Sequence, residues 1–105
     1  MNETLTLTVN VVSVKLIGVL GSAAGNREIM LPVSTILTVQ ELISALLKTV
    51  GNKFFRELLV DVGTEDPRSN VIILLNDQDC NIFDGLKTRI EPGTTVTIIP
   101  VAHGG

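Results

Sequence analysis

Hydrophobic and polar residues alternate along the N-terminal part of the chain. Leucine and valine alternate with threonine and asparagine over residues 5–11, and a second alternation of opposite parity places Val12, Val14 and Leu16 on one face. A period of two residues is typical of a half-buried β-strand. We therefore expect a strand over about residues 9–18, with a bulge at the change of parity or with residues 1–8 as an N-terminal extension.

A glycine-rich segment separates this strand from a second one. Glycine, serine and asparagine over residues 21–26 favour a turn, and residues 27–31 form a short strand-like run. Pro32 helps to end that run because proline has no N–H to donate to a sheet. We expect the two strands to form a hairpin.

The most regular pattern in the sequence begins at Thr38. Thr38 and Glu41 have the spacing of a capping box, in which each side chain accepts a hydrogen bond from the backbone N–H of the other residue. Apolar residues then recur at spacings of three and four, which predicts an amphipathic helix that ends at Gly51. The residues of this stripe are Val39, Leu42, Ile43, Leu46, Leu47 and Val50. A second, shorter helix is expected over about residues 53–59.

Loops and strands follow in the C-terminal half. Residues 61–70 are polar and predict a loop, and the apolar run Val71–Leu75 predicts a strand. The remaining expectations are, in order, a tight turn over residues 76–79, a short strand over 80–82, a connecting loop over 83–92 and a last strand over 95–99.

This order of elements predicts a two-layer α+β architecture. The main helix would cover one face of a mixed sheet of about five strands, with the first and last strands as parallel neighbours at its centre. That arrangement is the ubiquitin-like β-grasp fold. We expect one such domain over residues 1–100, followed by a flexible tail over residues 101–105.

Composition narrows the classes of function. With 45% hydrophobic and 18% charged residues, the chain of 105 residues is expected to be globular. A net charge of −3, scattered basic residues and the lack of tryptophan and tyrosine argue against direct binding of nucleic acid. The single cysteine, Cys80, excludes an internal disulfide, and no apolar run is long enough to span a membrane. The N-terminus lacks the basic region of a signal peptide, so we expect a cytoplasmic protein. We also expect a monomer.

No conventional catalytic or metal site is expected. The glycine-rich segment lacks the Gly-Lys-Ser/Thr of a phosphate-binding loop. Asp77, Asp79 and Asp84 lack the spacing of a calcium-binding loop and are more typical of turn carboxylates. His103 and Cys80 are too few for a zinc site or a catalytic triad. Cys80 is more typical of a small buried hydrophobic residue than of a nucleophile.

The sequence closes with His103-Gly104-Gly105 after an apolar strand and Pro100. We expect sheet pairing to weaken at Pro100 because it has no N–H to donate. Glycine carries no Cβ, so this end of the chain could pass through a narrow slot. The five residues from Val101 onward could reach about 16 Å. One interpretation is a reactive tail whose Gly105 carboxylate is presented to an enzyme, and the other is an ordinary frayed terminus.

A second candidate site lies on the sheet. Strand alternation places Ile72, Leu74 and Ile99 on the face opposite the helix. Exposed apolar patches often mark partner-binding sites, and the alternative is that a loop covers these residues. The residues expected to face the helix are Val71, Ile73, Leu75, Val96 and Ile98.

Several of these stretches together resemble the ubiquitin-related modifier family. Similar to that family are the apolar strand followed by Asn76-Asp77-Gln78-Asp79, the second strand ending in Leu31-Pro32, and the closing His103-Gly104-Gly105. The resemblance covers about residues 9–105. More distantly, the tail resembles those of the molybdopterin synthase small subunit and the thiamine sulfur carrier.

The resemblance implies a carrier that other enzymes act on and that is not itself an enzyme. An E1-like enzyme would use ATP-Mg to adenylate the Gly105 carboxylate, and a persulfide from a sulfur donor protein would convert it to a thiocarboxylate. The sulfur would pass to a tRNA thiolation enzyme, or the activated end would be joined to a lysine of a target protein. The chain would bind no cofactor of its own, and Gly104 and His103 would belong to the same tail.

Two other functions stay open. The chain could be the small subunit of a molybdopterin synthase, with its tail inserted into a larger subunit. It could also be a non-reactive β-grasp interaction domain in which the two final glycines have no chemical role.

Overall fold

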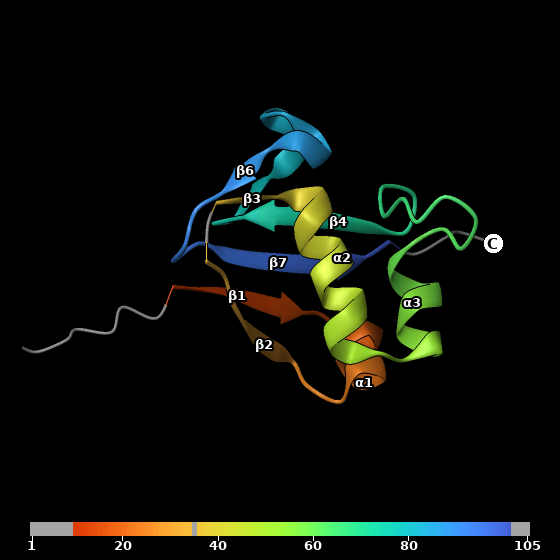
Figure 1. Cartoon of the computed structure of the whole chain (residues 1–105). Helices are drawn as coiled ribbons and strands as arrows, with labels where there is room; N and C mark the ends of the chain where they lie inside the picture. Colours follow the sequence, from red (N-terminus) through yellow and green to blue (C-terminus); the bar gives the residue numbers. More distant parts are fainter. Residues whose placement is uncertain (1–9, 35, 102–105) are drawn as a thin grey trace, which may run out of the picture.

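Two parallel strands form the middle of a five-stranded mixed sheet. The computed structural model describes residues 10–34 and 36–101, and within them β1 (Val11–Leu16) pairs in parallel with β7 (Thr95–Pro100). The strand order is β2-β1-β7-β4-β5 (Figure 1). The other three strands are β2 (Glu28–Pro32), β4 (Val71–Leu75) and β5 (Gln78–Asp79). The predicted α+β architecture and the central parallel pair are confirmed, whereas the expected extension over residues 1–8 lies outside the described residues.

One main helix, α2 (Val39–Val50), lies across one face of the sheet (Figure 1). The predicted capping box is present: the N–H of Glu41 donates to Oγ1 of Thr38 at 3.1 Å, and the N–H of Thr38 donates to Oε1 of Glu41 at 2.8 Å. Gly51 ends the helix in the left-handed conformation with φ of 61°. Five of the six stripe residues are buried against the sheet: Val39, Leu42, Ile43, Leu46 and Leu47.

The core between helix and sheet is almost entirely aliphatic. Val12, Val14 and Leu16 of β1 are buried, which confirms the second of the two predicted alternations. The expected short helix is α3 (Lys53–Leu59), and it contributes Phe55, which is fully buried. The residues expected to face α2 are buried as well: Val71, Ile73, Leu75, Val96 and Ile98.

The segment after β1 is a short helix, so the expected turn over residues 21–26 is wrong. α1 (Val19–Ala24) ends at Gly25, which has φ of 79° and whose N–H donates to the Gly21 carbonyl at 2.9 Å. Leu20 is fully buried, and removing this side chain from water favours a helix over an exposed turn. β1 ends at Leu16, earlier than expected, and it pairs with β2 in antiparallel register but is joined to it through α1.

The connection between β5 and β7 also differs from the expectation. Cys80–Ile82 is a 3-10 helix, η1, rather than a strand, because Oδ1 of Asp79 accepts a hydrogen bond from the N–H of Asn81 at 2.8 Å. Such local side-chain bonds compete with the hydrogen bonds of a sheet. The expected loop over residues 83–92 contains a second 3-10 helix, η2 (Gly85–Lys87), and β6 (Arg89–Ile90). β6 pairs with β3 (Leu37–Thr38) in a small second sheet that the sequence pattern did not predict.

Candidate functional site

The chain leaves the sheet at Val101, at the end of β7. The N–H of Val101 donates to the carbonyl of Asn70 at 2.9 Å, so pairing with the β4 side continues one residue beyond Pro100. The expectation that pairing weakens at Pro100 holds only on the β1 side, where the last bond runs from the N–H of Ile17 to the carbonyl of Ile98. On the β4 side it is wrong, because the carbonyl of Asn70, just before β4, accepts from the residue after Pro100. This exit lies at the end of the sheet where α1 and α3 pack (Figure 1).

Three of the predicted site residues, His103, Gly104 and Gly105, lie outside the described residues. Their starting point is nevertheless fixed by the position of Val101. Gly105 is the fourth residue after Val101, and an extended chain of that length reaches about 13 Å. Any enzyme that acts on Gly105 must bring its reacting group within that distance of the sheet end.

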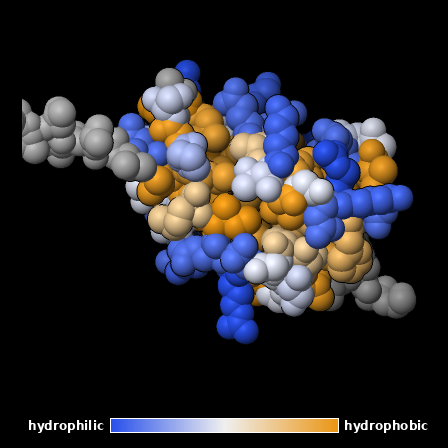
Figure 2. Space-filling view, turned by 60° about the horizontal axis from the view of Figure 1, so that its bottom comes forward, coloured by the Kyte–Doolittle hydropathy of each residue, from blue (hydrophilic) through white to orange (hydrophobic). Residues whose placement is uncertain are grey.

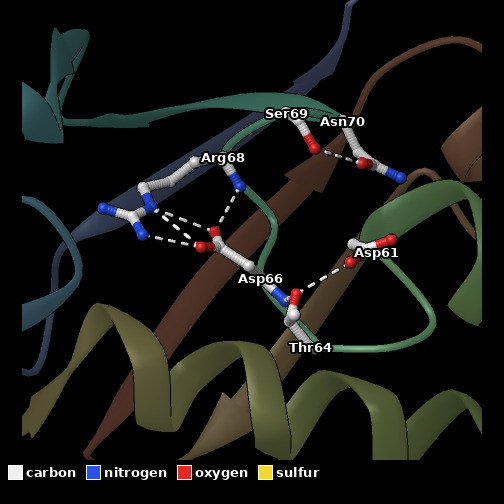
Figure 3. Close-up of polar contacts among 6 residues, drawn as sticks. All are labelled: Asp61, Thr64, Asp66, Arg68, Ser69 and Asn70. Atoms are coloured by element: carbon white, nitrogen blue, oxygen red, sulfur yellow. Dashed lines mark hydrogen bonds and ion pairs between the residues drawn. The ribbon is translucent and has the colours of Figure 1, made fainter.

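Asn70 connects the exit to α3. Its side-chain Nδ2 donates to the carbonyls of Glu57 at 3.3 Å and Leu58 at 3.4 Å, near the C-terminal end of that helix. The Ser69 hydroxyl donates to Oδ1 of Asn70 at 3.0 Å, as Figure 3 shows. No sequence pattern marks Asn70, and only a fold that brings the two segments together reveals its role.

The loop before Asn70 is ordered by polar contacts within it. Figure 3 shows Arg68 forked over the carboxylate of Asp66, with Nη2 to Oδ2 at 2.7 Å and Nε to Oδ1 at 3.0 Å. Hydrogen bonding from Arg68 lowers the pKa of Asp66, and the same pair raises the pKa of Arg68. The Thr64 hydroxyl donates to Asp61 at 2.9 Å. These bonds stabilise the conformation of the expected loop over residues 61–70, which ends at Asn70.

The predicted apolar patch is present on the open face of the sheet. Ile72 of β4 stands directly opposite Ile99 of β7 in the antiparallel register. Leu74 lies two residues along the same strand, so its side chain shares the face of Ile72. Ile72 is 41% exposed, while Leu74 and Ile99 are half-buried. The helices lie on the opposite face (Figure 1).

Two further residues extend the patch, and the sequence analysis did not include them. Ile17 follows the buried Leu16, and its N–H donates to the Ile98 carbonyl at 3.0 Å, so it continues the strand beside β7. Val101 follows Ile99 at the same parity. Ile17 is 43% exposed and Val101 is 36% exposed. We call Ile17, Ile72, Leu74, Ile99 and Val101 the open-face patch, and this patch reaches the point where the tail begins.

Apolar side chains are also exposed at the edge formed by β2 and α1. Figure 2 turns this edge forward and shows apolar surface between charged side chains. Val19 of α1 is 51% exposed and Met30 of β2 is 54% exposed. A shallow hollow between β2, β3 and α2 is lined in part by Leu31, Leu37 and Ala45. No feature of this hollow relates it to the tail, so the open-face patch is the better candidate for a partner-binding site.

The described side chains offer no metal site and no activated nucleophile. Within residues 10–34 and 36–101, no three histidine, cysteine, aspartate or glutamate side chains gather as metal ligands would. Cys80 is buried as expected, with 4% of its surface exposed. Burial raises the pKa of the Cys80 thiol, which disfavours the nucleophilic thiolate. Of the described helices, none has the length and apolar character needed to cross a membrane.

The sequence matches a known family over most of its length. The model of the ThiS family matches residues 14–105, which includes the tail. None of the curated proteins compared matches the sequence.

Several solved structures share the fold. Urm1 from Trypanosoma brucei is 27% identical with a TM-score of 0.73, and the match covers 92% of this chain and 97% of that one. A chain of the BexX/CysO complex from Amycolatopsis orientalis is 25% identical with a TM-score of 0.66, covering 90% of this chain and 99% of that one. The small archaeal modifier protein 1 from Methanosarcina acetivorans is 23% identical with a TM-score of 0.75, covering 93% and 99%. These likenesses confirm the ubiquitin-like β-grasp fold.

Proposed function

The chain belongs to the ThiS family of ubiquitin-like sulfur carriers, and we propose that Gly105 is the residue on which it carries sulfur. One observation carries this proposal: the family match runs through Gly105. The structure is consistent with it, because β7 leads the chain off the sheet at Val101 beside an exposed apolar patch. An enzyme bound to the open-face patch would have the tail within reach.

Adenylation is the first proposed step. A carboxylate is a poor electrophile until one of its oxygens becomes part of a good leaving group. An oxygen of the Gly105 carboxylate attacks the α-phosphorus of ATP-Mg bound to an E1-like enzyme. The bond from that phosphorus to the bridging oxygen breaks, and pyrophosphate leaves. The product is an acyl adenylate from which AMP can be displaced.

Sulfur transfer is the second proposed step. The terminal sulfur of a persulfide on a donor protein attacks the carbonyl carbon of Gly105 and displaces AMP, which gives an acyl disulfide. A second thiol then attacks the donor's sulfur and breaks the sulfur–sulfur bond to Gly105. The donor is left with a disulfide, and Gly105 is left with a thiocarboxylate. The attacking thiol is thus oxidised to a disulfide as the transferred sulfur is reduced.

This chain would contribute position rather than catalysis. Gly104 and Gly105 have no Cβ and so could enter a narrow channel toward ATP. The open-face patch would dock the carrier, because exposed apolar patches often mark protein-binding sites and a few residues at the centre of an interface provide most of its binding energy. One of the similar structures is itself of a complex, BexX/CysO, which is consistent with a carrier that binds partner proteins.

The acceptor distinguishes the finer alternatives. A tRNA thiolation enzyme or the large subunit of a molybdopterin synthase would take the sulfur of the Gly105 thiocarboxylate. A lysine of a target protein would instead attack the activated carbonyl carbon of Gly105, displace the leaving group and join the carrier through an isopeptide bond. The test incubates the carrier with ATP-Mg, a sulfur donor and the cognate E1-like enzyme, and then supplies each acceptor separately. Carrier-dependent release of pyrophosphate supports the proposal. Its absence, with an enzyme that activates another carrier, contradicts the proposal and leaves only the non-reactive interaction domain.

A further inference from the structure

Asn70 is the last residue that holds β7 before the tail begins. Its carbonyl accepts from the N–H of Val101 at 2.9 Å. On the other side of β7, pairing ends earlier, where the N–H of Ile17 donates to the carbonyl of Ile98 at 3.0 Å. In the part of the chain that the structure describes, no backbone hydrogen bond holds β7 beyond the one to Asn70. The direction in which the tail leaves therefore depends on where Asn70 is held.

Asn70 is in turn held on α3. Its Nδ2 donates to the carbonyls of Glu57 and Leu58, near a helix end where carbonyls lack partners within the helix. The hydroxyl of Ser69 donates to Oδ1 of Asn70, which sets the orientation of the amide (Figure 3). One residue thus ties the end of a helix to the start of the tail.

We propose that Asn70 is a positioning residue for the activation of Gly105. By tying Val101 to α3, it fixes the point and the direction from which the tail enters the activating enzyme. This inference rests on the proposed function. Reacting atoms must come within about 3.5 Å of each other in a productive orientation. Releasing Val101 would widen the range of tail directions, so a smaller fraction of docked carriers would present Gly105 to ATP.

Two asparagines at opposite ends of the same helix provide a matched test. Asn70→Ala removes the amide that fixes the exit to α3. Asn52→Ala is the control, because Oδ1 of Asn52 accepts from the N–H of Phe55 at 3.1 Å and its Nδ2 donates to the carbonyl of Ala23 at 2.9 Å. Each variant loses an asparagine that caps α3, so both should lose stability to a similar degree. Only Asn70 has a hydrogen bond to Val101.

The kinetic readout separates positioning from docking. In steady-state activation by the E1-like enzyme, we expect kcat for Asn70→Ala to fall about fivefold or more, since misplacement of reacting groups lowers the rate of the bound complex. KM should change by less than about twofold because Ile17, Ile72, Leu74 and Ile99 of the open-face patch keep their places. Asn52→Ala should match the wild type in both constants. Equal kcat values for the two variants would overturn the proposal.

Hydrogen exchange at the amides of the isolated carrier needs no activating enzyme. It therefore tests the anchor at Asn70 separately from the proposed function. We expect the Val101 amide to exchange about tenfold faster in Asn70→Ala than in the wild type or in Asn52→Ala. If the wild type is not activated, the proposed function fails and the exchange rate alone decides whether Asn70 anchors the exit. Unchanged exchange at Val101 in Asn70→Ala would overturn the anchor itself.

Discussion

Ile72 and Ile99 face each other across adjacent antiparallel strands on the side of the sheet away from α2. Directly opposed apolar pairs on neighbouring strands stabilise a sheet by at most about 1 kcal/mol. Ile72 nevertheless keeps 41% of its surface in water, at the sheet end from which the tail departs. Because this pair is only partly buried by folding and lies next to the start of the proposed reactive tail, it is suited to binding a partner.

Replacing Ile72 by lysine should therefore weaken docking more than folding. We expect KM for activation to rise about tenfold or more, because an ammonium group would be placed in an apolar interface. The free energy of unfolding should fall by about 1 kcal/mol or less, since the side chain is already exposed. Phe54→Lys is the control, because Phe54 of α3 is 59% exposed and α3 lies on the other face. Equal KM values for the two variants would contradict a docking role for the patch.

The two neighbouring phenylalanines of α3 should differ sharply in their effect on stability. Phe55 is fully buried, so Phe55→Ala should lower the free energy of unfolding by about 3–5 kcal/mol through lost burial and a residual cavity. Phe54 is mostly exposed, and Phe54→Ala should cost about 0.5 kcal/mol or less. Chemical denaturation of both variants measures these differences. Similar losses would mean that α3 does not pack as described.

The Asp66–Arg68 pair predicts a small dependence of stability on acid pH. Hydrogen bonding from Arg68 holds the pKa of Asp66 below its ordinary value of 3.8 in the folded state. The pair therefore stabilises the fold above that value, and this contribution disappears as the pH falls through the folded-state pKa. The effect should be small because the pair is exposed and solvent screens it. NMR titration of the Asp66 carboxyl should give a lowered pKa that Arg68→Ala raises; an unchanged pKa in that variant would exclude the pairing.

Cys80 should take no part in sulfur transfer. Burial raises the pKa of its thiol, so at neutral pH it should react slowly with iodoacetamide in the folded protein and rapidly after unfolding. Cys80→Ala should still gain sulfur at the wild-type rate, because the proposed acceptor is the Gly105 carboxylate. Intact mass after activation measures the gain. A Cys80→Ala protein that folds and is adenylated but takes up no sulfur would assign the sulfur to the thiol.

Elements with strong local signals could be predicted from the sequence. The capping box of Thr38 and Glu41 and the apolar stripe after it specify α2 without knowledge of the rest of the chain. Alternation in β4 and β7 likewise predicted which side chains are buried, and thereby located Ile72 on the open face.

Elements whose conformation depends on contacts between residues far apart in the sequence could not be predicted in this way. α1 has three glycines in or beside it and resembles a turn in sequence, but burial of Leu20 in the core selects a helix. Asn70 has the composition of an ordinary loop residue, and its partners Glu57 and Val101 are far from it in sequence. The contacts by which Asn70 anchors the tail therefore exist only in the assembled arrangement of α3, β4 and β7, and no local pattern predicts them.

The decisive measurement is the intact mass of the carrier after incubation with ATP-Mg, a sulfur donor and an active E1-like enzyme. We expect the wild type to gain the mass of one oxygen exchanged for sulfur, located by fragmentation on Gly105. A variant lacking Gly105 should gain nothing while keeping nearly the same melting temperature. An unchanged wild-type mass, or sulfur found on any residue other than Gly105, would contradict the proposal that Gly105 carries the sulfur.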